Sequence, residues 1–291
     1  MLTLFAIPKA FKGHTEIIQR NAIRSWTLLR PAPAIILLGD EQKTSETAIE
    51  FGLTHIPHIA RNEFGTPLLN DIFLKAGMSA AAGNLCYINS DIILMDDFME
   101  TVTRLKTRKS FLMVGRRWNL EVSNLLEFQS GWQEDLRKQI SERGEPETPD
   151  GIDYFLFPRG TWEKIPPFAI GRTMWDNWLI FEARRRGLCV IDATESVRIV
   201  HQKHDYAHVP TGDAWKGPES IRNVELAGGY ERAFTVEDAT HRVISGGVRR
   251  ALTGNYLRNR ILRLPVLNPW IGFVRRLIRA VAWRLRKVIQ R

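Results

Sequence analysis

The residues of this chain best suited to chemistry are polar side chains that follow directly on apolar runs. The run Leu85–Ile88 ends in Asn89, Ser90 and Asp91, and a second apolar run, Ile92–Leu94, begins at once. If the first run is a buried strand, these polar residues lie at the carboxyl end of a sheet, where open α/β sheets bind ligands. The carboxylate of Asp91 is suited there to a hard divalent ion that also binds a diphosphate, and its two neighbours offer neutral hydrogen bonds to the same ligand. A plain turn explains the triplet by itself equally well.

Two charged residues follow a second apolar run, Ala34–Leu38. Asp40 is placed to accept a hydrogen bond from a nucleobase N–H, although it equally well caps the helix expected after it. Arg61 begins a polar loop and is able to meet a diphosphate bidentately, or to meet the base. Thr66-Pro67, at the end of that loop, reads as an ordinary helix start.

An acid flanked by two tryptophans opens a later helix. Asp176 is expected to act as the base that takes a proton from an acceptor hydroxyl. Trp175, Asn177 and Trp178 are expected to bind the acceptor, because aromatic faces bind sugar rings. The alternative is a helix-start acid favoured by the helix dipole, with both indoles in the core.

Histidines are concentrated after the expected strand Arg198–Val200. Three of the seven histidines and one aspartate fall within residues 201–208, namely His201, His204, Asp205 and His208. We expect one imidazole to complete the coordination of the ion at Asp91, and we favour His201 over His204 for this role. A self-contained zinc site is the weaker alternative, because the spacing fits no usual structural zinc pattern and no cysteine is near.

The elements that must position these residues alternate between strand-length and helix-length segments. This alternation predicts an α/β domain with a largely parallel, open twisted sheet flanked by helices. Expected strands are 3–7, 34–38, 85–88, 92–94, 111–114, 154–157, 189–191 and 198–200. Expected helices lie near 15–29, 44–51, 68–81, 96–106, 133–143 and 174–186. Both cysteines, Cys86 and Cys189, fall in apolar runs, which favours free buried thiols and a cytoplasmic protein.

In the order of these motifs, the chain resembles the GT-A fold glycosyltransferases, in particular those of glycosyltransferase family 2. The family's triplet is usually Asp-x-Asp and binds Mn²⁺ or Mg²⁺ with the diphosphate of the sugar nucleotide. Here it reads Asn-Ser-Asp, so Asp91 alone stands for the direct metal ligand. Through this resemblance, Asp40 and Arg61 match positions that recognise the nucleotide, and Asp176 matches the catalytic base. His201 matches the C-terminal metal-binding histidine.

The resemblance also assigns a role to a glycine-containing loop. Asp150-Gly151-Ile152-Asp153 precedes the expected strand Tyr154–Phe157 and looks like the family's donor-binding loop. Asp153 is therefore expected to contact the sugar nucleotide. The resemblance covers about residues 1–210 and implies a GT-A-like, Rossmann-type mixed sheet.

The net charge of +9 is unevenly distributed along the 291 residues. After Asp238 the chain has thirteen Lys and Arg and no acidic residue, so 28 basic and all 32 acidic residues precede that point. We expect a catalytic domain over 1–238, with a nucleotide-sugar half at about 1–115 and an acceptor half at about 116–238. A basic helical extension is expected over 239–291. Such asymmetry favours a polyanionic surface as partner.

Within that extension, residues 268–291 have the spacing of a basic amphipathic helix. Its apolar stripe opposite several arginines is typical of a helix that lies on an anionic membrane. The alternative is a helix packed on the core with a solvated basic face. Nucleic acid is not expected as a partner, because the aromatic and basic residues occupy opposite faces. We therefore expect peripheral association with the inner face of the membrane.

Together these features predict an enzyme that moves a sugar from a nucleotide-diphosphate sugar to an acceptor hydroxyl. It is expected to be metal-dependent and inverting, with a lipid-linked or surface-polysaccharide acceptor. Two alternatives remain open: a nucleotidyltransferase that makes the sugar nucleotide, and a non-catalytic basic adaptor that binds membrane or nucleic acid.

Overall fold

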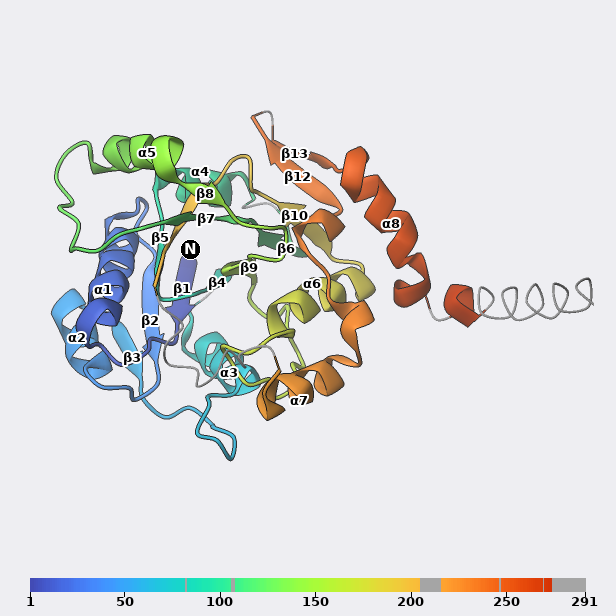
Figure 1. Ribbon diagram of the computed structural model, residues 1–291, viewed down its shortest axis with the longest axis horizontal. Helices are drawn as coiled ribbons and strands as arrows, with labels where there is room; N and C mark the ends of the chain where they lie inside the picture. Colours follow the sequence, from blue (N-terminus) through green and yellow to red (C-terminus); the bar gives the residue numbers. More distant parts are fainter. Residues whose placement is uncertain (82, 106–107, 205–215, 246, 269, 274–291) are drawn as a thin grey trace, which may run out of the picture.

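The apolar runs of the sequence become neighbouring strands of one mixed sheet in the computed structural model (Figure 1). The structure describes residues 1–81, 83–105, 108–204, 216–245, 247–268 and 270–273. The nine strands of the main sheet are ordered β13-β12-β10-β6-β9-β4-β1-β2-β3. Their bounds are Leu2–Ala6 (β1), Ala34–Leu38 (β2), Thr54–Ile56 (β3), Asn84–Ile88 (β4), Phe111–Val114 (β6), Tyr154–Pro158 (β9), Cys189–Asp192 (β10), His241–Ile244 (β12) and Gly247–Arg250 (β13).

Most of these strands run parallel, so their carboxyl ends meet at one edge. The pairs β1–β2, β1–β4, β2–β3, β6–β10 and β10–β12 are parallel. β9 runs antiparallel between β4 and β6, and β13 runs antiparallel to β12. The result is an open mixed sheet whose ligand-binding edge carries the residues that follow β1, β2 and β4.

A second sheet of four short strands lies over that edge. Its order is β5-β11-β7-β8, with bounds Ile92–Ile93 (β5), Arg117–Leu120 (β7), Glu145–Pro146 (β8) and Ile199–Gln202 (β11). β11 is antiparallel to β5 and parallel to β7. The sheet therefore brings three segments that are distant in sequence next to the end of β4.

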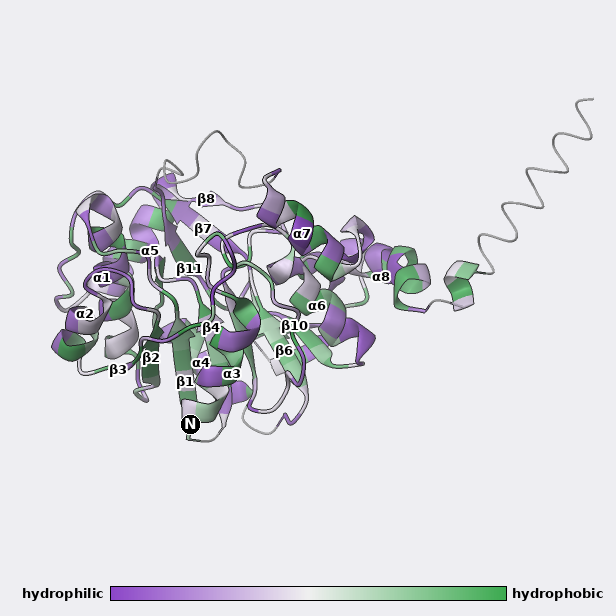
Figure 2. Cartoon of the chain, turned by 90° about the horizontal axis from the view of Figure 1, so that it is seen from below, coloured by the Kyte–Doolittle hydropathy of each residue, from purple (hydrophilic) through white to green (hydrophobic). Residues whose placement is uncertain are grey.

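Helices cover both faces of the main sheet (Figure 1). The apolar sides of α1, α2 and α4 pack on one face, and those of α3, α6 and α7 pack on the other; α5 covers the small sheet. Figure 2 shows hydrophobic residues concentrated on the inner strands. The helix bounds are Gly13–Leu28 (α1), Thr44–Phe51 (α2), Leu69–Ser79 (α3), Asp96–Arg104 (α4), Trp132–Arg143 (α5), Trp175–Arg185 (α6), Pro218–Ala227 (α7) and Gly254–Leu267 (α8), with short 3₁₀ turns at Tyr230–Arg232 and Val236–Asp238.

The predicted fold class is confirmed, and the strongly patterned elements fall within two residues of their expected bounds. β2, α2 and β6 agree at both ends. The sequence patterns did not predict β3, β7, β8, β12, β13 or α7, which are short or carry polar residues along one side. α8 lies within the basic helical extension expected over 239–291, although its bounds were not predicted. Cys86 and Cys189 are free thiols, buried and half-buried respectively.

The predicted domain boundary after Asp238 is wrong as a description of the sheet. β12 pairs with β10 and extends the main sheet, and β13 pairs with β12. Residues 241–250 therefore belong to the α/β domain, because the strand edge left by β10 is completed by chain beyond the boundary. The predicted helix over 268–291 lies almost entirely outside the described residues. Among the described helices, none is long and apolar enough to cross a membrane.

Candidate active and metal-binding site

Asp91, His201 and His204 form a cluster of metal-ligating side chains at the carboxyl edge of the sheet. Nε2 of His204 lies 3.0 Å from Oδ2 of Asp91, and Nε2 of His201 lies 3.5 Å from the same oxygen. One ligand atom from each residue lies within 4.8 Å of the others. Within the described part of the chain, this is the one group of three such residues close enough to share an ion.

Strand pairing explains how residues so far apart in sequence meet. Asp91 lies in the turn between β4 and β5, and β11 pairs with β5 so that His201 faces Ile92. The side chain of Gln202, fully buried, donates a hydrogen bond to the carbonyl oxygen of Asp91 over 2.9 Å. His201 was expected just after a strand ending at Val200; it lies within β11 instead, because the polar pair His201-Gln202 continues the pairing. Asp205 and His208 of the same predicted cluster lie outside the described residues.

The surroundings of Asp91 fit a bound cation. Oδ1 of Asp91 is buried and has no hydrogen-bond partner among the described residues, and such an oxygen is costly to leave unpaired. A cavity of about 30 Å³ adjoins it, lined by Lys9, Gln19, Ser90 and His204 among others, which is the space of one water or ion. Desolvation raises the pKa of Asp91, but attraction to His201 and hydrogen bonds with both histidines lower it well below its usual range. Asp91 is therefore an anion that could hold a cation.

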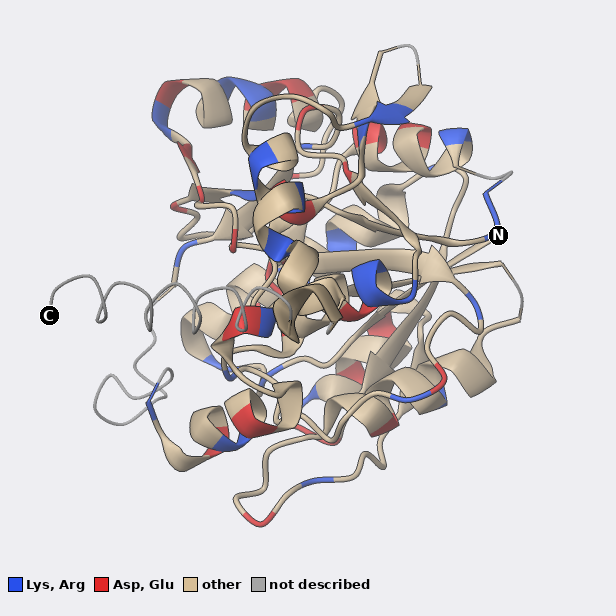
Figure 3. Cartoon of the chain, turned by 90° about the vertical axis from the view of Figure 1, so that its right-hand side faces the viewer, with Lys and Arg blue, Asp and Glu red and all other residues tan. Residues whose placement is uncertain are grey.

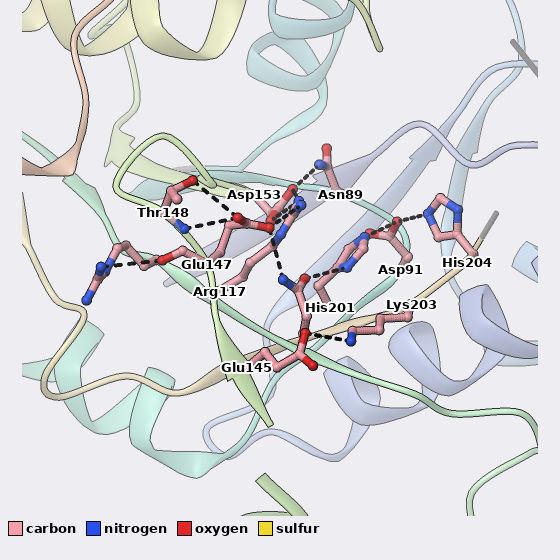
Figure 4. A network of polar contacts seen from close by, with 12 residues as sticks. Asn89, Asp91, Arg117, Glu145, Glu147, Thr148, Asp153, His201, Lys203 and His204 are labelled. Carbon is pink, nitrogen blue, oxygen red and sulfur yellow. Dashed lines mark hydrogen bonds and ion pairs between the residues drawn. The ribbon is translucent and has the colours of Figure 1, made fainter. Parts of the chain in front are cut away.

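A polar network behind His201 holds the imidazole in place (Figure 4). Nδ1 of His201 lies 3.0 Å from Oδ1 of Asn119. Nδ2 of Asn119 donates to Glu147 over 2.9 Å, and Arg117 donates to the same carboxylate over 3.0 Å. Although partial burial raises the pKa of Glu147, hydrogen bonds from Asn119 and Thr148 and the charge of Arg117 lower it to about 2.

The same network reaches the predicted donor-binding loop. Arg117 makes a two-bond ion pair with Asp153, at 3.0 and 3.1 Å, and Asp153 is almost completely buried. Asn89 donates to Asp153 over 2.6 Å and accepts from the hydroxyl of Tyr87 over 2.9 Å. The expected contacts of Asn89 and Asp153 with a sugar nucleotide therefore start from side chains already engaged inside the protein. Ser90 is similarly engaged, because its hydroxyl donates to Gln19 over 2.9 Å.

Asp176 has the electrostatics expected of a general base. It lies in the first turn of α6, and its Oδ1 accepts a hydrogen bond from the backbone N–H of Asn177 over 2.8 Å. Desolvation, with the negative charges of Asp153 and Asp150, raises the pKa of Asp176 to about 7. Burial raises the pKa of Tyr87, and the charges of Asp91, Asp153 and Asp176 raise it further. The hydroxyl of Tyr87 is therefore influenced by the negative charge of all three carboxylates.

The structure does not offer the tryptophan faces to a ligand, and this prediction is wrong. The ring of Trp175 contacts Tyr87 and Phe155 with centroid distances of 5.3 and 5.5 Å, and Trp178 packs edge-on against Phe168. Both indoles are at most 6% exposed. They form the apolar stripe of α6, which is buried against the sheet.

Asn177, also predicted to bind the acceptor, has its side-chain amide tied internally. Its Nδ2 donates to the carbonyl oxygen of Phe234 over 2.8 Å. It therefore fastens α6 to the segment before the 3₁₀ turn at Val236–Asp238.

Asp40 and Arg61, expected to recognise the nucleotide, meet at the end of β2. The guanidinium of Arg61 lies 2.6 Å from Asp40 and 2.7 Å from Glu41. The hydrogen bond from Arg61 and its charge lower the pKa of Asp40. Asp40 is exposed, and Arg61 is partly so. Both groups are therefore accessible to a ligand at this edge of the sheet.

Sequence reasoning missed the residues that support the site. Arg117 and Asn119 lie on one side of β7, and Trp118 and Leu120 lie on the apolar side against α5. This alternation is the signature of a half-buried strand and was the available signal. The roles of Gln19 and Gln202 had no signal in the sequence, because they depend on which loops meet.

The fold is that of GT-A glycosyltransferases. GalNAc-T7, solved with UDP, GalNAc and Mn²⁺, superposes with a TM-score of 0.50 at 13% identity; the match covers 78% of this chain and 48% of that chain. Glucosyl-3-phosphoglycerate synthase of Mycobacterium tuberculosis, solved with Mn²⁺, UDP and glucosyl-3-phosphoglycerate, gives 0.49 at 14% identity and covers 79% of this chain and 80% of that chain. The mannosyltransferase PcManGT of Pyrobaculum calidifontis, solved with GDP-Man and Mn²⁺, gives 0.45 at 10% identity, with coverages of 70% and 57%.

No protein-family model matches the chain, and no curated protein matches it. The predicted GT-A fold is confirmed by the structural likeness to GalNAc-T7. At 13% identity that likeness concerns the fold, and the activity must be argued from the residues of the site.

Proposed function

We propose that this protein is a metal-dependent glycosyltransferase that moves a sugar from a nucleotide-diphosphate sugar to an acceptor hydroxyl. The observation that carries the proposal is the cluster of Asp91, His201 and His204 at the carboxyl edge of a GT-A sheet. Within it, Oδ1 of Asp91 is buried and has no hydrogen-bond partner among the described residues. Solved structures with this fold hold UDP or GDP-Man together with Mn²⁺.

Asp91, His201 and His204 are the residues that would hold the ion. One carboxylate and two imidazoles are a mixed oxygen and nitrogen set, and imidazole nitrogen suits the transition ions better than Mg²⁺. We therefore favour Mn²⁺ over Mg²⁺ as the cofactor. When bound, a divalent ion would neutralise charge that develops on the departing diphosphate.

The nucleotide would lie along the ends of β1, β2 and β4. Asp40 would accept a hydrogen bond from the base, and Arg61 would exchange an acidic partner for a phosphate oxygen, which it can bind bidentately. Asn89 and Asp153 would lie beneath the sugar, held by Arg117. Ser90 would support Asp91 from the buried side through Gln19.

Asp176 would act on the acceptor. Its carboxylate would take the proton of the acceptor hydroxyl as the acceptor oxygen attacks the anomeric carbon and the bond to the diphosphate breaks. Direct displacement of this kind inverts the anomeric configuration. A pKa near 7 leaves the carboxylate basic enough to accept that proton and largely ionised at slightly alkaline pH.

The acceptor would reach Asp176 at a membrane surface, in keeping with a lipid-linked or surface-polysaccharide acceptor on the cytoplasmic face. The support for this part of the proposal is the absence of acidic residues after Asp238, with thirteen basic residues in the same stretch.

A thermal-shift screen tests the proposed function. Nucleoside diphosphates and sugar nucleotides are added with and without Mn²⁺, and a ligand that binds the folded state raises the melting temperature. We expect a shift that requires Mn²⁺ and disappears in Asp91→Asn. With the sugar nucleotide that binds, release of nucleoside diphosphate would support glycosyl transfer, whereas release of pyrophosphate would support a nucleotidyltransferase. No shift with any ligand would overturn the proposal.

A further inference from the structure

Helix α8 is attached to the domain by its polar side. Arg263 lies 3.2 Å from the buried carboxylate of Asp238 and stacks 4.6 Å above the ring of Phe234. Arg260 donates to the carbonyl oxygen of Thr240 over 3.2 Å. The hydroxyl of Tyr256 donates to Asp192, at the end of β10.

The opposite side of α8 exposes apolar residues to solvent. Leu257, Ile261 and Leu264 follow one another at i, i+4 and i+7, so they share one helical face. Ile261 is 59% exposed, and Leu262 beside it is 50% exposed. No residue of α8 is fully buried. α8 therefore differs from the usual surface helix. Arg260 and Arg263 face the protein, together with the partly buried Val266 and Leu267 at the end of the helix, whereas Leu257, Ile261 and Leu264 remain exposed.

The apolar surface continues past the end of α8. Trp270, Ile271 and Phe273 are described as helical, and Trp270 is 80% exposed. Figure 2 shows apolar positions on α8 and on the helical turn that follows it, at the edge of the molecule away from the sheet. We call the exposed set Leu257, Ile261, Leu262, Leu264, Trp270, Ile271 and Phe273 the α8 surface.

Exposed basic side chains occur on α8 and on the strand that precedes it in the chain, and no acidic residue of the segment balances them. Arg258 is exposed within α8, and Arg249 and Arg250 are exposed in β13 just before it. Figure 3 views the molecule from the side that carries α8. From residue 239 onward the chain has no Asp or Glu. Exposed aliphatic and aromatic side chains beside arginines are the composition of a surface that lies in an anionic membrane interface.

We propose that the α8 surface binds an anionic lipid bilayer, with Leu257, Ile261 and Trp270 entering the interface and Arg258 meeting the headgroups. The proposal is independent of the enzymatic function and concerns the folded domain, not only the residues beyond 273. A second copy of the chain is disfavoured as the occupant. A twofold interface would set these arginines against one another, with no acid of the segment to pair with them.

Vesicle co-sedimentation of the full chain tests the proposal. The probes are phosphatidylcholine vesicles and phosphatidylcholine vesicles containing phosphatidylglycerol. We expect binding to the anionic vesicles that weakens as salt is raised, and little binding to phosphatidylcholine alone. The double variant Leu257→Ser/Ile261→Ser should lower the partition coefficient by on the order of tenfold or more, because two aliphatic side chains leave the interface. Arg258→Glu should lower it by roughly tenfold through charge reversal.

Matched controls remove the same side-chain types elsewhere. Ile49→Ser alters an isoleucine that is 78% exposed on α2, and Arg24→Glu reverses an exposed arginine of α1. Both controls should bind vesicles like the unaltered chain, and all variants should keep its melting temperature. Failure of the chain to bind anionic vesicles would overturn the proposal. Equal binding by Leu257→Ser/Ile261→Ser would also overturn it, as would a dimer that this variant dissociates in the absence of vesicle binding.

Discussion

Oδ1 of Asn119 lies 3.0 Å from Nδ1 of His201, and this contact fixes which imidazole nitrogen faces Asp91. Glu147 is ionised and can only accept hydrogen bonds, so the group of Asn119 that faces it must be the NH₂. The carbonyl oxygen of Asn119 then faces His201 and requires an N–H on Nδ1. A protonated Nε2 donates to the carboxylate of Asp91, whereas an Nε2 without its proton presents a lone pair 3.5 Å from the carboxylate oxygen. Two acceptors at that distance are stabilised by a cation between them.

Asn119 should accordingly control metal affinity without touching the metal. We expect Asn119→Ala to weaken Mn²⁺ binding by about 10- to 100-fold, the usual effect of losing the group that orients a ligating histidine. Calorimetric titration of Mn²⁺ into the protein measures it. Asn255→Ala, at an exposed position of α8, is the matched control. Unchanged Mn²⁺ affinity in Asn119→Ala would show that His201 is held by other contacts or is not a ligand.

Removing the charge of Asp91 should abolish the ion site. Asp91→Asn keeps the side-chain shape but loses the anionic oxygens, so Mn²⁺ should no longer raise the melting temperature. Turnover of the sugar nucleotide should fall to background. Near-normal turnover by Asp91→Asn would contradict the metal assignment.

Asp176 should set the pH dependence of catalysis. Desolvation and the neighbouring carboxylates raise its pKa to about 7. Below that pH the base is protonated, and kcat/KM should rise about tenfold per pH unit before levelling off above it. Asp176→Asn should lose this rise together with most of the activity. A pH profile that is flat between mildly acidic and alkaline pH would exclude Asp176 as the base.

The same pKa predicts a gain of stability when Asp176 is neutralised. The folded protein holds a proton on Asp176 up to about pH 7, whereas the unfolded chain releases it near pH 4. Between these values the folded state binds more protons, so the contribution of Asp176 to stability falls as pH rises. Asp176→Asn should therefore unfold at higher temperature than the unaltered chain at pH above about 7, but not at about pH 4. Thermal unfolding of the metal-free proteins at both pH values measures the difference.

The ion pair between Arg117 and Asp153 should be structural as well as functional. Arg117→Met leaves a buried carboxylate without its cation and should lower the free energy of unfolding by about 3–5 kcal/mol. Adding Asp153→Asn removes the stranded charge and should restore most of the loss. Arg222→Met, which breaks the exposed pair with Glu63, should cost less than about 1 kcal/mol. Equal effects of the two single variants in urea unfolding would contradict this account.

Arg61 should contribute to nucleotide affinity and little to stability. Its partners Asp40 and Glu41 lie at 2.6 and 2.7 Å on an accessible edge. Arg61→Ala should weaken nucleoside diphosphate binding on the order of tenfold, because a charge-assisted phosphate contact is lost. Lys43→Ala, which removes a nearby exposed cation paired with Glu16, should bind the nucleotide normally. An unchanged nucleotide-induced thermal shift in Arg61→Ala would place the diphosphate elsewhere.

Local pattern in the sequence determined the sheet-and-helix framework and the position of Asp91. An apolar run that ends in polar residues predicts the end of a buried strand, because the apolar side chains favour the core and the polar side chains favour its edge. The same reasoning identified His201 and His204 as ligand types. It failed for Trp175 and Trp178, because residue type alone does not tell whether an aromatic ring faces the core or a ligand.

Only the tertiary structure decided how the site is assembled. The pairing of β11 with β5 sets His201 and His204 against Asp91 across about 110 residues of chain. The pairing of β11 with β7 sets Asn119 beside His201. Such register depends on long-range strand contacts that no short segment specifies. The orientation of helix α8 has the same origin, since Arg263 and Arg260 turn inward to reach Asp238 and Thr240, whose positions the fold provides. The sequence therefore determined which metal-binding and acid–base side chains the chain contains, and the fold determined which of them lie in the same site.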